Sequence, residues 1–187
     1  MDLDVERDLV KRAQKDPAAF GALYDHYYPK IFGYVLRRTA DLEAARDITS
    51  EAFFKALDKL WQFRWRNVPF SAWLYRIASN EISQFYRRPE YRKSTSLDEL
   101  QEQGFEAVSA SDPEGELIEA QEKLERHREY LEIRRRIGRL PARYQEVVAL
   151  RFFEQKQIKE ICAILGKKEG TVKSLLHRAI ERLREAE

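Results

Sequence analysis

The sequence predicts an all-α protein made of two small helical domains joined by a flexible acidic linker. Only 7 Gly and 6 Pro occur in 187 residues, apolar residues recur at helical spacing, and no segment alternates with the period of a strand. Charge is distributed unevenly along the chain. Residues 1–88 contain 15 Lys and Arg against 12 Asp and Glu, residues 89–125 contain 3 against 11, and residues 126–187 contain 16 against 9. We therefore expect domains at 1–88 and 113–187, with the linker at 89–112.

Composition narrows the function classes. With 43% hydrophobic and 12% aromatic residues the chain can build a core, while no long apolar run or signal peptide is visible, so we expect a cytoplasmic protein. The single cysteine, Cys162, is expected to be a small buried hydrophobe, and the three histidines lie far apart, which predicts no metal site and no cofactor. We find no nucleophile with a base, no paired carboxylates in a cleft and no phosphate loop, and so expect no enzyme.

Three helical patterns fill the first domain. The first carries apolar residues at helical spacing, with Pro29 expected to mark a break or kink. The second covers LEAARDITSEAFFKALDKLW and the third begins near Pro69. Their candidate inner positions are Phe20, Leu23, Tyr24, Tyr27 and Ile31 in the first, Ala45, Ile48, Ala52 and Leu60 in the second, and Trp73, Leu74, Ile77, Ala78 and Ile82 in the third.

Helical order is expected to resume after the linker. Asp112 followed by Pro113 is typical of a helix start, and this helix is predicted to run to about Arg139. Pro141 then begins another helix. Its Tyr144 and the apolar residues that follow offer a broad surface against which the last two helices of the chain can pack.

The end of the chain predicts a helix-turn-helix. Apolar residues at i, i+3, i+4 and i+7 define a short helix that stops at Gly166, and a second helix begins three residues later. The inner faces carry Ile158, Ile161, Cys162 and Leu165 in the first helix and Val172, Leu176, Ala179, Ile180 and Leu183 in the second. The side chains expected to point outward are Thr171, Lys173, Ser174, His177 and Arg178, which are types that bond bases and phosphates. The pair is therefore predicted to bind DNA through its second helix.

Two ordered sets of segments resemble a known family, the extracytoplasmic-function (group IV) sigma factors of bacterial RNA polymerase. AFGALYDHYYPKIFGYVLRR, DITSEAFFKALDKLWQFR and AWLYRIASN resemble the family's region 2. LPARYQEVVALRFFE, EICAILG and GTVKSLLHRAIERLR resemble its region 4. The resemblance implies promoter recognition, with region 2 at the −10 element and region 4 at the −35 element.

The second motif departs from the family pattern at three positions. Gln157 and Lys168 stand where capping residues are usual, which predicts a loss of about 1 kcal/mol in helix stability that packing can offset. Leu175 stands where many members carry an arginine, so one DNA contact is expected to be missing.

The resemblance also implies partners. Core RNA polymerase is expected to bind through the clamp helices of its largest subunit and the flap of its second-largest subunit, and an anti-sigma factor is expected as regulator. The candidate polymerase-binding residues are Asp47, Glu51, Phe54 and Lys55, with Phe54 as an aromatic anchor.

Holding melted DNA requires aromatic faces, cations and amides close together. The candidate −10 residues are Arg64, Trp65, Arg66, Asn67, Arg76, Asn80, Arg87 and Arg88. Of the tryptophans, Trp61 and Trp73 are expected to pack in the core and Trp65 to be an exposed contact.

At the −35 element, the five outward residues of the second motif helix are expected to reach the major groove, with Thr171 either contacting a phosphate or capping the helix. The candidate phosphate contacts are Arg151, Lys156, Lys159, Lys167 and Lys168.

One alternative stays open from the residues: a stand-alone helix-turn-helix regulator whose first 88 residues form an interaction domain. The segment WQFRWRN argues against it, because a regulator of duplex DNA has no need of a dense aromatic and basic cluster for extruded bases.

Overall fold

The computed structural model describes residues 1–65, 68–88, 132–133 and 135–185, and within these ranges the chain is helical with no strand. The predicted all-α class is confirmed. None of the described helices is both long and apolar enough to cross a membrane. The linker at 89–112 and the predicted helix start at Asp112 lie outside the described residues, whereas 132–133 and 135–139 are helical, as expected.

The first four long helices pack into a small bundle. Their bounds are α1 Leu3–Ala13, α2 Phe20–Thr39, α3 Leu42–Asp58 and α4 Phe70–Phe85, with short 3-10 turns η1 at Pro17–Ala19 and η2 at Leu60–Gln62. Helices α2, α3 and α4 contact one another, and α1 lies across α2. The predicted inner positions are buried or half-buried except Tyr24, which is 39% exposed.

Pro29 does not break α2. The helix runs through it from Phe20 to Thr39, so the predicted break is wrong. A proline inside a helix costs ~3 kcal/mol because one backbone hydrogen bond is lost. Tyr27 and Ile31 are buried on either side of Pro29, so packing against the neighbouring helices stabilises α2 on both sides of the proline.

Helix starts in this bundle are capped in two ways. The side chain of Asp41 accepts a hydrogen bond from the backbone N–H of Ala44 at 2.9 Å, which caps α3 locally. Helix α4 follows Pro69, which has no side-chain cap; instead the backbone N–H of Ser71 donates to Glu6 Oε1 at 3.1 Å. A carboxylate from α1 therefore satisfies the first turn of α4.

The helix-turn-helix is present as predicted. Helix α7 (Ala142–Val148) continues as the π-helical turn η3 (Ala149–Phe153), and α8 (Ile158–Leu165) and α9 (Glu169–Glu185) form the motif. Gly166 ends α8 with φ 63°, the left-handed conformation expected of it. The buried motif residues include the predicted Ile161, Val172, Leu176 and Ala179, and also Ile164, which the pattern missed.

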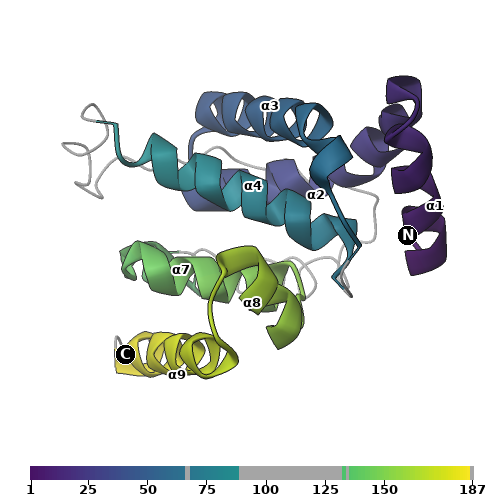
Figure 1. The fold of residues 1–187 in the computed structure, drawn as a ribbon. Coiled ribbons are helices and arrows are strands. Elements are labelled where there is room, and N and C mark those ends of the chain that lie inside the picture. The colour runs from purple at the N-terminus through teal and green to yellow at the C-terminus, as the bar shows by residue number, and fades with distance from the viewer. Residues whose placement is uncertain (66–67, 89–131, 134, 186–187) are drawn as a thin grey trace, which may run out of the picture.

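The two halves of the chain pack against each other. Figure 1 shows α7, α8 and α9 on one side of α4 and α3 on the other, and α8 contacts α4 while η3 contacts α2. One apolar cluster joins them: Leu74 and Ala78 of α4 belong to the same cluster as Leu150 and Ile161. The sequence pattern indicated two domains but gave no sign of this shared core.

Candidate nucleic-acid and polymerase interfaces

Helix α4 presents two of the predicted −10 residues. Arg76 and Asn80 are exposed and lie one turn apart on α4, so they share a face. Arg87 and Arg88 are exposed just after the helix ends. The other four candidates belong to the preceding loop, where Arg64 is exposed, Trp65 is half-buried, and Arg66 and Asn67 lie outside the described residues.

The Arg64 side chain stabilises the loop before α4. Arg64 donates from one guanidinium nitrogen to the carbonyl of Trp61 at 2.7 Å and to that of Phe63 at 3.1 Å. Trp65 packs partly on the core and its ring meets the Phe63 ring edge-on, so it is less exposed than expected. The loop aromatics are therefore divided between core packing and surface.

The other two tryptophans differ from each other. Trp73 packs in the core as predicted, with its ring centroid 5.3 Å from that of Phe63 and 5.6 Å from that of Phe70. Trp61 is 65% exposed, so the prediction that it packs is wrong. It lies in the turn η2, where the neighbouring Leu60 takes the buried position.

A hollow of about 350 Å³ lies beside this face of α4. Its lining comes from both halves of the chain and comprises Gln62, Phe63, Arg64, Val68, Ala72, Trp73, Arg76 and Ala163. Aromatic and cationic groups therefore share one recess, as a base extruded from a duplex needs. Ala163 belongs to α8, so the motif helix forms one wall of the recess.

Helix α3 offers the candidate polymerase surface. Asp47 and Glu51 are exposed one turn apart, and Phe54 is 66% exposed beside them. Lys55 is engaged within the domain, because its ammonium lies 2.7 Å from Glu81 and 3.1 Å from Glu51. The hydrogen bond to Glu81 is the main reason that the pKa of Lys55 is raised.

The outward face of α9 has the predicted composition. Thr171, Lys173, Ser174, His177 and Arg178 are all exposed. Lys173 pairs with Glu169 at 2.6 Å and His177 with Glu181 at 3.1 Å, both one turn away along α9. Such exposed pairs are weak and exchange readily for a phosphate or base contact. Among the phosphate candidates, Arg151, Lys159, Lys167 and Lys168 are exposed.

Two departures from the family pattern have local explanations. The Glu160 carboxylate accepts the backbone N–H of Gln157 at 2.8 Å, so the start of α8 is satisfied by the helix's own third residue. Leu175 is half-buried and packs against both apolar clusters of the chain. A leucine at this position therefore adds packing between the motif and α7.

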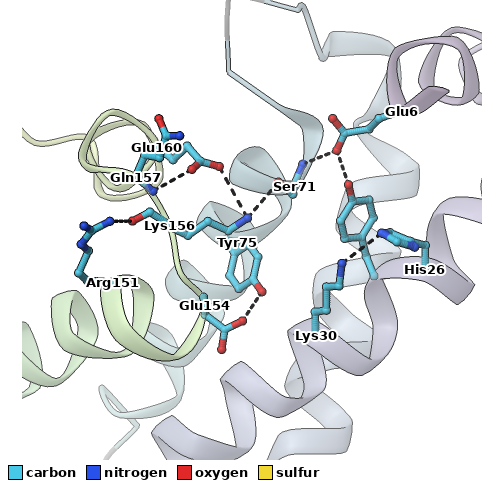
Figure 2. Close-up of polar contacts among 11 residues, drawn as sticks. Glu6, His26, Lys30, Ser71, Tyr75, Arg151, Glu154, Lys156, Gln157 and Glu160 are labelled. Carbon is cyan, nitrogen blue, oxygen red and sulfur yellow. Dashed lines mark hydrogen bonds and ion pairs between the residues drawn. The ribbon is translucent and has the colours of Figure 1, made fainter. Parts of the chain in front are cut away.

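Glu154, which the sequence analysis missed, and Lys156 join the two halves of the chain (Figure 2). Glu154 follows η3, and its side chain is only 6% exposed. It accepts hydrogen bonds from the Arg37 guanidinium of α2 and, at 2.5 Å, from the Tyr75 hydroxyl of α4. Burial and this carboxylate both raise the pKa of Tyr75, so the phenol stays protonated and donates.

Lys156 lies two residues further along. Its ammonium donates to Ser71 Oγ at 3.2 Å and sits 4.8 Å from the Tyr75 ring centroid. Its side chain is 15% exposed, and burial lowers its pKa. The expectation that Lys156 binds phosphate is therefore wrong for this arrangement, because α4 covers it. Gln155 between the two contacts has φ 51°, and this turn directs both toward α4.

Family comparisons now bear on the whole chain. Residues 23–92 match sigma-70 region 2, and residues 130–183 match sigma-70 region 4. The chain is 31% identical over 187 residues to the ECF RNA polymerase sigma factor SigW of Bacillus subtilis, which covers 98% of this chain and 97% of the relative. The chain belongs to the extracytoplasmic-function sigma factors.

Other relatives agree with this membership. The ECF RNA polymerase sigma-E factor of Escherichia coli is 33% identical over 182 residues, covering 92% of this sigma factor and 89% of the relative. The ECF RNA polymerase sigma factor BldN of Streptomyces coelicolor is 32% identical over 177 residues; the match covers 94% of this chain but 63% of the length of BldN.

Solved structures support the fold of this sigma factor. CnrH in complex with the cytosolic domain of CnrY has a TM-score of 0.67 at 21% identity, covering 97% of this chain and 96% of that one. RpoE in complex with the anti-sigma factor NepR from Bartonella quintana has a TM-score of 0.62, also at 21% identity, covering 89% of this chain and 94% of that one.

The two matched regions coincide with the two packed groups of helices in this sigma factor. Helices α3 and α4 and most of α2 fall within region 2, and α7, α8 and α9 fall within region 4, apart from the last residues of α9. Helix α1 precedes the region 2 match.

Proposed function

We propose that this sigma factor binds bacterial core RNA polymerase in the cytoplasm and directs promoter-specific initiation through −10 and −35 contacts. The observation that carries the proposal is the ordered pair of regions with an exposed basic recognition helix in the second. Domains at 1–88 and 113–187, joined by residues 89–112, divide these tasks. Chemistry belongs to the polymerase, and the sigma factor contributes recognition.

The −35 element is read by α9. Lys173, Ser174, His177 and Arg178 face outward along the first ten residues of α9, where side chains reach major-groove base edges. Thr171 in the first turn contacts a phosphate. Arg151, Lys159, Lys167 and Lys168 supply further phosphate contacts, which add affinity that salt weakens.

The −10 element is read by α4 and the loop before it. Arg76 and Asn80 offer a cation and an amide beside the recess lined by Phe63 and Trp73, which supports capture of an unpaired base there. Arg64 lines the recess, Trp65, Arg66 and Asn67 are further candidate contacts in the same segment, and Arg87 and Arg88 continue the basic track. Ala163 of α8 forms one wall of the recess, so full access requires region 4 to move away from α4.

Polymerase binding falls to α3. Asp47 and Glu51 provide two exposed carboxylates for a basic partner, and Phe54 provides an apolar anchor. Lys55 has its ammonium held by Glu81 and serves to fix α3 to α4. The flap of the second-largest subunit is the partner of region 4, and an anti-sigma factor is the regulator, by analogy with the RpoE and NepR complex.

Run-off transcription with bacterial core polymerase on a promoter library tests this function. Wild type should yield specific transcripts that core polymerase alone does not. Arg76→Ala/Asn80→Ala and Lys173→Ala/Arg178→Ala should each lose or redirect them, because each bidentate base contact contributes roughly 1–3 kcal/mol of discrimination. Arg12→Ala, an exposed cation of α1 in an ion pair with Asp8, is the matched control.

The opposite outcome is equally specific. If the chain neither binds nor redirects core polymerase while it binds duplex DNA tightly by itself, the stand-alone regulator is the correct function. The polymerase contacts assigned to α3 would then have no partner.

A further inference from the structure

A second hollow of about 300 Å³ lies on the other side of the loop, against α1. Arg7 and Lys11 of α1 line it together with Gln14, which follows α1, and Phe63, Arg64 and Trp65 line it from the loop. Phe63 and Arg64 also line the recess beside α4, so the loop separates two adjoining hollows. Helix α1 precedes the region 2 match, and the function proposed above gives it no role.

The α1 side chains are fixed relative to the loop. Gln14 donates from Nε2 to the carbonyls of Leu60 and Phe63, each at 3.0 Å, and so ties the end of α1 to the loop. The Arg7 guanidinium lies 5.7 Å from the centroid of the Trp65 ring. A guanidinium near an aromatic ring keeps N–H donors available for phosphate oxygens.

Charge in this hollow is of one sign. Its lining contains Arg7, Lys11 and Arg64 and no carboxylate. Within the described part of the chain neither Arg7 nor Lys11 has an ion-pair partner, whereas Arg12 on the same helix pairs with Asp8 at 3.7 Å. Two unpaired cations one turn apart beside an indole form a recess suited to an anion that carries a ring.

We propose that this hollow binds one nucleotide of the unpaired promoter strand, with its phosphate held by Arg7 and Lys11 and its base against Trp65. The inference rests on the proposed function and extends the DNA surface onto α1. The strand then crosses the loop at Phe63 and Arg64, from the recess beside α4 to the hollow beside α1.

Forked promoter DNA measures this contact in the holoenzyme. The probe is a promoter recovered from the run-off library, prepared once as duplex and once with the non-template strand unpaired from the −10 element onward. Arg7→Ala/Lys11→Ala should weaken binding of the forked probe about tenfold and leave the affinity for core polymerase unchanged. The slope of log affinity against log salt should become shallower by about 0.7, since one single-strand phosphate contact is lost.

The controls separate binding from support of the fold. Arg12→Ala should behave as wild type on both probes. Arg7→Lys/Lys11→Arg keeps both charges and should retain most of the salt slope. Equal weakening on forked and duplex DNA, or an unchanged salt slope, would show that α1 merely supports the loop and would overturn the proposal.

Failure of this inference is distinguishable from failure of the function. If the wild-type holoenzyme transcribes specifically and the Arg7→Ala/Lys11→Ala holoenzyme binds the forked probe as tightly as wild type, the α1 site is wrong while the sigma function stands. If wild type yields no specific transcript, the function itself is wrong, and with it the unpaired strand that the α1 site requires.

Discussion

Glu6 is a buried carboxylate that connects three helices. It is 1% exposed, accepts the Tyr27 hydroxyl of α2 and accepts the Ser71 backbone N–H of α4. Both donors lose their partner if the carboxylate is removed. The Glu6 side chain therefore fixes α1 to the rest of the bundle and accepts a hydrogen bond from the first turn of α4, the helix that carries Arg76 and Asn80.

Replacing Glu6 by alanine should destabilise the chain by about 3 kcal/mol, because a buried phenol and a buried N–H are left unpaired. Urea unfolding measures the loss. Glu43→Ala is the matched control: Glu43 pairs with Arg46 at 2.8 Å on the surface and its side chain is 77% exposed, so the change should be within about 0.5 kcal/mol. Similar losses for the two variants would contradict the role of Glu6.

Glu146 of α7 gives the contact between the halves a pH dependence. Burial raises the pKa of its carboxyl, against the opposing effects of Arg38, Ser79 and Lys167. A raised pKa means that the folded chain binds this proton more tightly than the unfolded chain. The stabilisation is therefore complete below the ordinary pKa near 4.5 and is lost as pH rises through the raised value.

Glu146→Gln removes this titration. The variant should melt at a higher temperature than wild type above the raised pKa of Glu146, and the difference should shrink as pH falls through that pKa toward 4.5. Thermal unfolding at a series of pH values measures it, and the difference between the two chains cancels the titration of the other groups. A difference that stays constant with pH, or grows as pH falls, would contradict the assignment.

At the scale of elements, periodicity predicted most of what the structure contains. The motif helices have strong apolar spacing and a glycine stop, and α8 and α9 lie where expected. Pro29 was misjudged because a local rule says nothing of the packing on either side of it. Trp61 was misjudged because its exposure depends on the short turn η2, which the apolar spacing of the sequence does not predict.

The turn of the motif depends on Gly166. Its φ is 63°, and a Cβ there would meet no atom within 4 Å, so alanine would suffer backbone strain alone, about 1 kcal/mol. Gly170 also has open space but lies inside α9 without a positive φ. Gly170→Ala should therefore stabilise the chain by about 0.5–1 kcal/mol, while Gly166→Ala should destabilise it. Equilibrium denaturation of the two variants should show opposite signs, and equal signs would contradict the role assigned to the φ value.

At the scale of the whole molecule, Glu154 and Lys156 hold region 4 on region 2. Glu154→Ala/Lys156→Ala removes the contacts to Arg37, Tyr75 and Ser71, so the radius of gyration measured by small-angle X-ray scattering should increase. Lys159→Ala, an exposed change in α8, should leave it unchanged. An unchanged radius in the double variant would mean that the shared apolar cluster suffices to hold the halves together.

This packing marks the limit of prediction from the sequence. The outward residues of α9 follow from the spacing along one helix, and all five are exposed as expected. Glu154 and Tyr75 are 79 residues apart in the chain, and nothing in the local pattern around either indicates the other. Lys156 was predicted to be a surface cation of a basic motif. Its burial by α4 cannot be predicted from the residues next to it in the sequence.

The wall that α8 adds to the recess beside α4 affects when the chain can hold single-stranded DNA. In the closed arrangement the exposed faces of α3 and α9 remain free, but Ala163 stands against the surface that carries Arg76. Binding at a partly covered surface is weakened by the fraction of molecules that are open. If the recess takes up an unpaired base as proposed, the free protein should bind single-stranded DNA weakly, and this binding should strengthen once region 4 has moved away from α4.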